Sequence, residues 1–423
     1  MISNLQFGRP VVEQMNALGY TAAAVGNHEF DWGVDTLKSR VQEMRFSALG
    51  ANMFERRTNK LPRWVRSDTT VVRRGMKVGI VGLAYPGTPS VTLATNVAHL
   101  RFDDDSTVAA LVSQQLRKRG AAVVVGVGHI PAETDSSRRA RGDLARLGRV
   151  RTVDAWLGGH SHNVVDDVVE GRPILIAGAQ GQYLAVLDLV VDPIRRAVVE
   201  SDGRVDLVYA DVPLDSAWTA RVEHWNANVA PVAATVLGEA AVALHRRRPE
   251  ATIGDFICDA MRADSKADIA MQNPGGMRAE LDAGPITRGD VYAVMPFDNT
   301  IVTLELSGEL VKLAIEQALR GDRITQVSGL RFVIDTSKPD LEKVISMTLA
   351  DGSPFDLRKT YRVAVNNFMA TGGDRYDALT QGRNKLDTGR LIRDAMEDWV
   401  KAQCAGGKPL SIPGDGRITQ TGR

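Results

Sequence analysis

Three short glycine-containing loops of the sequence carry side chains that are able to bind metal ions. They are Gly26–Gly33 (Gly-Asn-His-Glu-Phe-Asp-Trp-Gly), Gly128-His129, and Gly158–Asn163 (Gly-Gly-His-Ser-His-Asn). Amide oxygens and imidazole nitrogens are common metal ligands, and glycine lets the backbone bend closely around an ion. The candidate metal and catalytic residues are therefore Asn27, His28, Asp31, His129, His160 and His162.

Each loop also fits an ordinary structural role when taken alone. A strand-to-helix turn with a capped histidine explains the first loop, and a lone histidine at a strand end is more often structural than a ligand. Together the loops are a stronger signal, because each follows a predicted strand of one domain and they hold four of the seven histidines. In an extended chain, side-chain alternation would direct His160 and His162 to the same side.

The elements that must position these loops alternate between helix and strand. Apolar residues at helical spacing predict helices over 10–18, 35–44 and 107–118. Short apolar runs predict strands over 21–25, 47–51, 69–85 and 122–127, and then over 173–177, 184–191 and 205–210. This alternation favours an α/β sheet that helices cover on both faces, where ligands bind beyond the carboxyl ends of the strands.

The second half of the chain reads as a further mixed α and β unit. Residues 216–239 are rich in Ala and Val and predict a helical connector. Helices are expected over 252–261, after a Ser307 cap, and over 388–399. Strands are expected over 268–271, 301–306, 330–334 and 361–365.

Length and composition limit the possible classes of protein. A chain of 423 residues suggests two domains, and 52 basic against 51 acidic residues give no reason to expect a nucleic-acid partner. The apolar runs are shorter than the roughly 20 residues of a membrane-spanning helix. Cys258 and Cys404 are too isolated to form a disulfide framework, and we expect Cys258 to be buried. The N-terminus has no signal-peptide pattern, and no protein partner can be inferred.

The order of the three loops resembles the calcineurin-type metallophosphoesterases, and Asn16–Tyr20 ahead of the first loop narrows the resemblance to the 5'-nucleotidase family. Gly254–Met261, Asn273–Arg278 and Asn367–Asp374 resemble the C-terminal substrate-binding domain of that family. The implied fold is an α/β metallophosphoesterase sandwich in helix/sheet/sheet/helix layers, truncated at its start, plus a mixed α+β domain. The expected limits are 1–213 for the first domain, 214–238 for a helical connector and 239–423 for the second domain.

The resemblance implies roles for the loop residues. Asn27, His129 and His160 would hold one metal ion, and His162 would be a ligand of a second. His28 would stabilise the phosphoryl transition state or assist the leaving oxygen, with Asp31 orienting it. The family implies two divalent ions of the Zn, Mn, Co or Mg class, and one or none in this chain, because the Asp-x-His and Gly-Asp motifs that supply the other ligands do not occur upstream of Gly26.

The resemblance also implies a nucleotide pocket in the second domain. Phe297 and Phe368 match an aromatic pair that sandwiches a base, although a core role is the commoner fate of a Phe. Asp374 would accept from the ribose hydroxyls, Asn273 would meet the base or sugar edge, and Gly276 would allow close approach of the backbone. Arg278 would pair with ribose or phosphate, and Arg247 is assigned with an uncertain register because its neighbours are also arginines.

The expected activity is metal-dependent hydrolysis of nucleoside 5'-monophosphates or related nucleotides by in-line attack of an activated water. A 2',3'-cyclic-nucleotide phosphodiesterase with 3'-nucleotidase activity, or a UDP-sugar hydrolase, would use the same ligands. A catalytically impaired nucleotide-binding protein is the alternative of another class. By resemblance the protein would be periplasmic or secreted.

Overall fold

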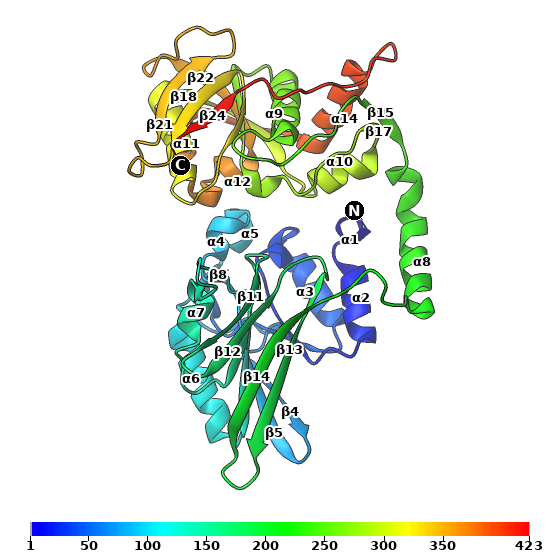
Figure 1. Cartoon of the computed structure of the whole chain (residues 1–423), viewed down its shortest axis with the longest axis vertical. Coiled ribbons are helices and arrows are strands. Elements are labelled where there is room, and N and C mark those ends of the chain that lie inside the picture. The colour runs from blue at the N-terminus through cyan, green and yellow to red at the C-terminus, as the bar shows by residue number, and fades with distance from the viewer. Residues whose placement is uncertain (1, 423) are drawn as a thin grey trace. The chain divides into compact units, whose positions relative to one another are not determined.

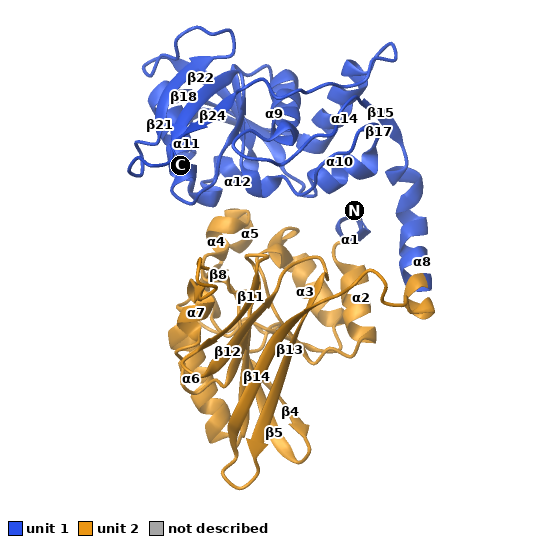
Figure 2. Cartoon of the chain, viewed as in Figure 1, with its two compact units in different colours: residues 1–6, 220–423 blue, residues 7–219 orange. Residues whose placement is uncertain are grey.

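The computed structural model describes residues 2–422, and they form two compact units (Figures 1 and 2). Unit 1 comprises Met1–Gln6 and Ala220–Arg423, and unit 2 comprises Phe7–Thr219. Both units mix helices and strands, as the sequence predicts.

Unit 2 is built on a six-stranded sheet of order β11-β12-β10-β7-β5-β4. The strands are Val164–Val169, Arg172–Ala177, Ala155–Leu157, Val123–Gly128, Met76–Leu83 and Asp68–Arg73. The four inner strands are parallel, while β11 and β4 pair antiparallel at the two edges. Parallel strands place their carboxyl ends on one edge, so the loops after β5, β7 and β10 leave the sheet on the same side.

Further elements of unit 2 lie against this sheet. Helix α6 (Asp105–Lys118) packs on β5, where Leu116 lies over Gly79. The hairpin β13 (Tyr183–Asp192) and β14 (Ala197–Leu207) packs on β12 through Gly203. Strand β1 (Ala22–Ala24) lies along the chain between α2 (Arg9–Ala17) and α3 (Gly33–Glu43). It pairs in parallel with β2 (Ser47–Leu49), which follows α3. The last strand begins at Ala197, earlier than the expected 205–210.

Unit 1 contains a five-stranded sheet of order β19-β16-β22-β18-β23. Its strands are Gln326–Ser328, Ile269–Gln272, Thr360–Asn366, Thr300–Ser307 and Arg383–Leu391. Apolar residues cover both faces: Ala364 of β22 joins one core with α9 (Thr252–Ser265), whereas its neighbours Val363 and Val365 join another with α11 (Gly308–Leu319). Alternation along a strand that is buried on both faces explains its continuous apolar sequence.

Two predicted helices of unit 1 have different limits in the structure. The connector helix α8 (Ser216–Ala233) ends before the predicted limit at residue 238. Strand β15 (Val236–Ala240) begins three residues after the helix and pairs with β17 (Gly284–Thr287). The helix expected over 388–399 is wrong in its first turn. Residues up to Leu391 belong to β23, and α14 begins at Ile392 and runs to Gln403. The predicted cap is confirmed, since Leu310 N donates to Ser307 Oγ over 3.3 Å.

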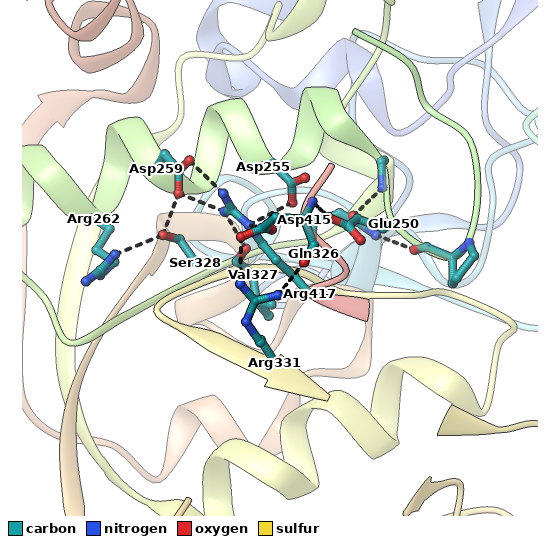
Figure 3. A network of polar contacts seen from close by, with 12 residues as sticks. Glu250, Asp255, Asp259, Arg262, Gln326, Val327, Ser328, Arg331, Asp415 and Arg417 are labelled. Carbon is teal, nitrogen blue, oxygen red and sulfur yellow. Dashed lines mark hydrogen bonds and ion pairs between the residues drawn. The ribbon is translucent and has the colours of Figure 1, made fainter. Parts of the chain in front are cut away.

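The C-terminal segment of unit 1 is held by ion pairs. Strand β24 (Ile418–Thr421) pairs in parallel with β20 (Leu330–Asp335). Just before it, Arg417 donates to both carboxylate oxygens of Asp259 on α9, over 2.7 and 2.9 Å, and pairs with Asp415 over 2.9 Å. Figure 3 shows Arg417 among Asp255, Asp259 and Asp415; we call these four residues the Arg417 network.

None of the helices described within residues 2–422 is long and apolar enough to cross a membrane. Both cysteines are free thiols, and Cys258 is buried as predicted.

Candidate metal and nucleotide sites

The first predicted loop continues directly from β1 into a short 3-10 helix, His28–Phe30. Asn27 is buried at the start of this turn, and its Nδ2 donates to the carbonyl of Val91 over 3.2 Å. That bond orients the side-chain Oδ1 in the opposite direction. A Cβ at position 26 would lie 2.9 Å from the ring of His129, so glycine is required for the close approach of the two loops.

Three of the predicted ligands converge. Asn27 Oδ1 lies 2.9 Å from His129 Nε2 and 3.1 Å from His160 Nδ1, and the two ring nitrogens are 3.1 Å apart. His129 directly follows β7, and two glycines separate the end of β10 from His160. We call Asn27, His129 and His160 the three-loop cluster. The shared edge of the parallel strands β7 and β10 brings His129 and His160 together. Asn27 follows β1 of a separate two-stranded sheet and meets them from 102 and 133 positions away.

The three-loop cluster fits one metal ion better than a complete metal centre. Ligands at about 2.1 Å from an ion in octahedral geometry are about 3 Å from each other, which matches the separations here. Burial is the main cause that lowers the pKa of His129 to about 3, and the neighbouring His160, His28 and His162 lower it further. The imidazole of His129 is therefore neutral at pH 7. Within residues 2–422, no three His, Cys, Asp or Glu side chains are grouped to hold an ion, and Asn27 is the third donor.

The loop that carries His160 and His162 is not the extended chain that the alternation argument assumes. Both His160 and His162 have positive φ angles, 71° and 59°, so the segment between them is not extended. Non-glycine residues rarely adopt this conformation, and when they do the surroundings must hold them there. His160 turns its ring toward Asn27, whereas His162 is exposed.

His28 and Asp31 form the pair that the sequence predicts. His28 Nδ1 lies 2.9 Å from Asp31 Oδ2, and the imidazole is almost half exposed. An Nδ1–H that donates to a carboxylate fixes the tautomer and the orientation of the imidazole. The 3-10 turn brings these two side chains, three residues apart, onto one side.

In unit 1 the predicted nucleotide residues Asn273 and Asp374 are in direct contact. Asn273 Nδ2 donates to Asp374 Oδ2 over 2.7 Å, and Asn273 Oδ1 accepts from Gln272 and Asn366. A Cβ at Gly276 would lie 2.1 Å from Gln272 Nε2, so this position needs glycine. The carboxylate of Asp374 is thus fixed by a buried amide network.

The remaining predicted residues of unit 1 surround this pair to different degrees. Arg278 Nη1 donates to the carbonyl of Gly275, and its guanidinium lies 5.8 Å from the ring centre of the half-buried Phe297. The ring of Phe368 lies against Gly373, next to Asp374. Arg247 is exposed, and its charge acts on Glu280.

Two residues near these sites were not singled out from the sequence. Tyr85, at the carboxyl end of β5, stacks on His160 with ring centres 4.6 Å apart. Arg323 pairs with Asp374 Oδ1 over 2.6 Å. The position of Tyr85 at the end of the strand segment predicted over 69–85 was a usable signal, whereas nothing in the local sequence of Arg323 indicates its partner 51 residues later.

Comparisons with known proteins match both units. The family described as 5'-nucleotidase, C-terminal domain, matches residues 232–381. The endonuclease YhcR of Bacillus subtilis (strain 168) is 28% identical over 99% of this chain and 35% of its own length. The trifunctional nucleotide phosphoesterase protein YfkN of the same organism is 28% identical over 97% of this chain and 31% of its own length. The chain thus spans about a third of these two relatives.

Among solved structures, a 5'-nucleotidase precursor from Thermus thermophilus superposes with a TM-score of 0.85 and 29% identity, over 99% of this chain and 87% of that one. The likeness extends through both units and confirms the resemblance that the loop motifs carry.

Proposed function

Because the chain is a relative of the 5'-nucleotidases, we propose that it takes part in metal-dependent hydrolysis of nucleoside 5'-monophosphates or related nucleotides. The products are a nucleoside and inorganic phosphate. The observation that carries the proposal is the convergence of Asn27, His129 and His160, whose lone-pair donors face one another within 3.1 Å.

We propose that the three-loop cluster holds one divalent ion. Two imidazole nitrogens and an amide oxygen favour a transition metal such as Zn, Mn or Co over Mg, which prefers oxygen ligands alone. When bound, such an ion neutralises phosphate charge and promotes attack by water. His162 is the proposed ligand of a second ion, by resemblance.

His28 and Asp31 supply the proton chemistry of the proposal. Asp31 accepts from His28 Nδ1–H, which keeps the imidazole in one orientation. A protonated His28 is able to donate from Nε2 to the ester oxygen as the phosphorus–oxygen bond breaks. Water adds its oxygen to phosphorus, and the nucleoside leaves with the donated proton.

Unit 1 is the proposed binder of the nucleoside part. Asp374 keeps lone pairs beside its bonds to Asn273 and Arg323, so it can accept from ribose hydroxyls. Phe297 and Phe368 offer ring faces for a base, with stacking worth about 1 to 3 kcal/mol per base. Gly276 lets the amide network lie close to the backbone, and Arg278 is the proposed partner of ribose or phosphate. Arg247 remains a weaker candidate for the same role.

Other substrates remain alternatives with the same ligands. YfkN is called a trifunctional nucleotide phosphoesterase and YhcR an endonuclease, which supports a broader set of phosphate esters. A 2',3'-cyclic-nucleotide phosphodiesterase with 3'-nucleotidase activity and a UDP-sugar hydrolase are the nearest alternatives, and a nucleotide-binding protein without turnover is the alternative of another class. We also propose a location outside the cytoplasm.

The test separates and quantifies by chromatography the products formed from 5'-AMP, 3'-AMP, 2',3'-cyclic AMP, a UDP-sugar and a short oligonucleotide, with Mn²⁺, Co²⁺, Zn²⁺ or Mg²⁺ added singly. We expect 5'-AMP to be hydrolysed fastest and chelation to abolish turnover. The variant His129→Ala is the matched control for the metal site. Adenosine binding without any metal-dependent turnover would contradict hydrolysis and favour the binding protein.

A further inference from the structure

Tyr85 occupies a defined slot beside the three-loop cluster. Its ring stacks on the imidazole of His160 at 4.6 Å between centres, with 29° between the ring planes. On another side the ring lies close to Gly87: a Cβ there would fall 2.6 to 2.9 Å from three atoms of the phenol. The backbone of Gly87 and the ring of His160 therefore confine the phenol ring.

The turn that carries Tyr85 is itself fixed. Thr88 N donates to the carbonyl of Tyr85 over 3.0 Å, and Thr88 Oγ1 donates to the same oxygen over 2.6 Å. Thr88 is buried and begins the short helix α4 (Thr88–Val91), whose last residue accepts from Asn27. One short segment thus contacts two of the three side chains of the three-loop cluster.

His160 needs such a support more than His129 does. Its φ of 71° lies in the left-handed region, which is strained for a non-glycine residue. His129 follows the regular strand β7 and packs against Gly26. A flat ring stacked on His160 limits the rotation of the imidazole and keeps Nδ1 directed at Asn27 Oδ1, 3.1 Å away.

A role in core packing alone does not account for this arrangement. Tyr85 is half-buried, and it belongs to neither apolar core of unit 2. The neighbours that confine its ring are the imidazole of His160 and a glycine whose missing side chain makes room for the phenol.

We propose that Tyr85, seated on Gly87, is a positioning residue for the metal ligand His160, and that its stacked ring sets the affinity of the three-loop cluster for a divalent ion. This inference rests on the proposed function only in taking His160 as a ligand. Partners that orient a ligand typically change metal affinity by about 10- to 100-fold when removed.

The experiment measures the affinity of the whole chain for Co²⁺ alone by calorimetry. We expect Tyr85→Ala and Tyr85→Leu to bind Co²⁺ about 10-fold more weakly, since neither side chain offers a flat ring. Gly87→Ala should weaken binding to a similar degree, because its Cβ displaces the phenol. Tyr85→Phe keeps the ring and should stay within about 2-fold of the natural chain.

The control is Tyr20→Ala, which removes a tyrosine of the same unit that packs on Phe46, with ring centres 5.9 Å apart. We expect its Co²⁺ affinity to be unchanged. A second measurement needs no metal: the ring protons of His160 are shielded by the stacked phenol in the NMR spectrum, and they should move downfield in Tyr85→Ala but not in Tyr85→Phe.

His160→Ala separates the two levels of the proposal. If it weakens Co²⁺ binding while Tyr85→Leu and Gly87→Ala do not, the role of Tyr85 is overturned and the metal site stands. If His160→Ala itself leaves the affinity unchanged, the proposed metal site fails and the role of Tyr85 fails with it. Equal losses in Tyr85→Phe and Tyr85→Ala would also overturn positioning by the ring.

Discussion

The three-loop cluster of unit 2 and the Arg417 network of unit 1 both gather polar side chains from distant segments, but they balance charge differently. In the Arg417 network, a guanidinium that is 15% exposed meets Asp259 in a double hydrogen bond and Asp415 in a further pair. In the three-loop cluster, two imidazoles and an amide oxygen face one another, and none of the three groups is a carboxylate or a guanidinium. In the first arrangement opposite charges pair directly and stabilise the fold, although both carboxylate oxygens of Asp255 are buried without a hydrogen bond to any of residues 2–422. We propose that a cation completes the second arrangement.

The largest expected effect is on stability, from Arg417→Met. Among the residues that the structure describes, the change leaves Asp259 with only the hydroxyl of Ser328 and Asp415 with only Arg331 as partners. Removing one partner of a buried ion pair typically costs about 3 to 5 kcal/mol, which is the upper limit that we expect here. Hydrogen exchange of α9 and β24 under increasing denaturant measures the loss. The control Arg204→Met removes a cation from exposed pairs with Asp188 and Asp206, where we expect at most about 1 kcal/mol. Equal effects of the two variants would break the comparison.

The opposite outcome is expected for His129→Ala. Loss of one ligand should lower kcat/KM for the best nucleotide by about 100-fold or more, because charge neutralisation at phosphate depends on the ion. Hydrogen exchange of unit 1 should not change. His99→Ala is the control, since His99 is exposed and the sequence assigns it no site role. A fall in activity no larger than that of the control would show that the three-loop cluster is structural.

The pH dependence of stability sharpens the account of the Arg417 network. Burial is the main cause that raises the pKa of Asp255 from 3.8 to about 8. The charge of Arg417 lowers this pKa, while Glu250 and Asp259 raise it further. The folded chain therefore holds one proton more than the unfolded chain between these values. The contribution of Asp255 is complete below pH 4 and is lost as pH rises toward 8.

We expect the free energy of unfolding of unit 1 to fall by about 1 kcal/mol per pH unit between pH 6 and 8, relative to Asp255→Asn, which cannot titrate. Denaturant-dependent hydrogen exchange of α9 at pH 6, 7 and 8 measures this difference. Asp188→Asn, on the exposed hairpin of unit 2, is the control. Parallel pH profiles for the natural chain and Asp255→Asn would contradict the assignment.

The smallest expected effect concerns Asp374. Like the Arg417 network, it is held by hydrogen-bonded partners, and like the three-loop cluster, it keeps lone pairs that can accept from a ligand. Asp374→Asn places an amide opposite the donors of Asn273 and Arg323, and we expect adenosine to bind about 10-fold more weakly. Calorimetry with adenosine measures it. Asp377→Asn, an exposed neighbour three residues later, should bind adenosine as the natural chain does.

Much of unit 2 was predictable because its strands are short, apolar and separated by helices. The strand before His129 ends where the sequence places it, and its neighbours pair with it in parallel. Since the parallel strands β7 and β10 share an edge, the meeting of His129 and His160 follows from the pattern. Asn27 follows β1 of a separate sheet, so its meeting with them depends on tertiary packing. The sequence-based prediction was wrong where one local pattern fits two structures. Residues 388–391 carry helical periodicity, yet they continue β23 because β18 offers them hydrogen bonds.

The position of His162 was not predictable from side-chain alternation. That argument assumes an extended backbone, and the positive φ angles of His160 and His162 break it. The pairing of Arg323 with Asp374 was not predictable either, because only the packing of the loop after α11 brings Arg323 to Asp374. Neither feature has a signature within a few neighbouring residues.

The sequence by itself determined which side chains are available and which strand ends carry them, because residue type and hydrophobic period are local properties. Only the tertiary structure decided which donors share one point, that the ring of Tyr85 lies stacked on His160, and that Arg417 is enclosed by carboxylates. These features depend on distances between segments that are far apart along the chain. Such distances follow from packing, where small differences in backbone angle decide which atoms meet.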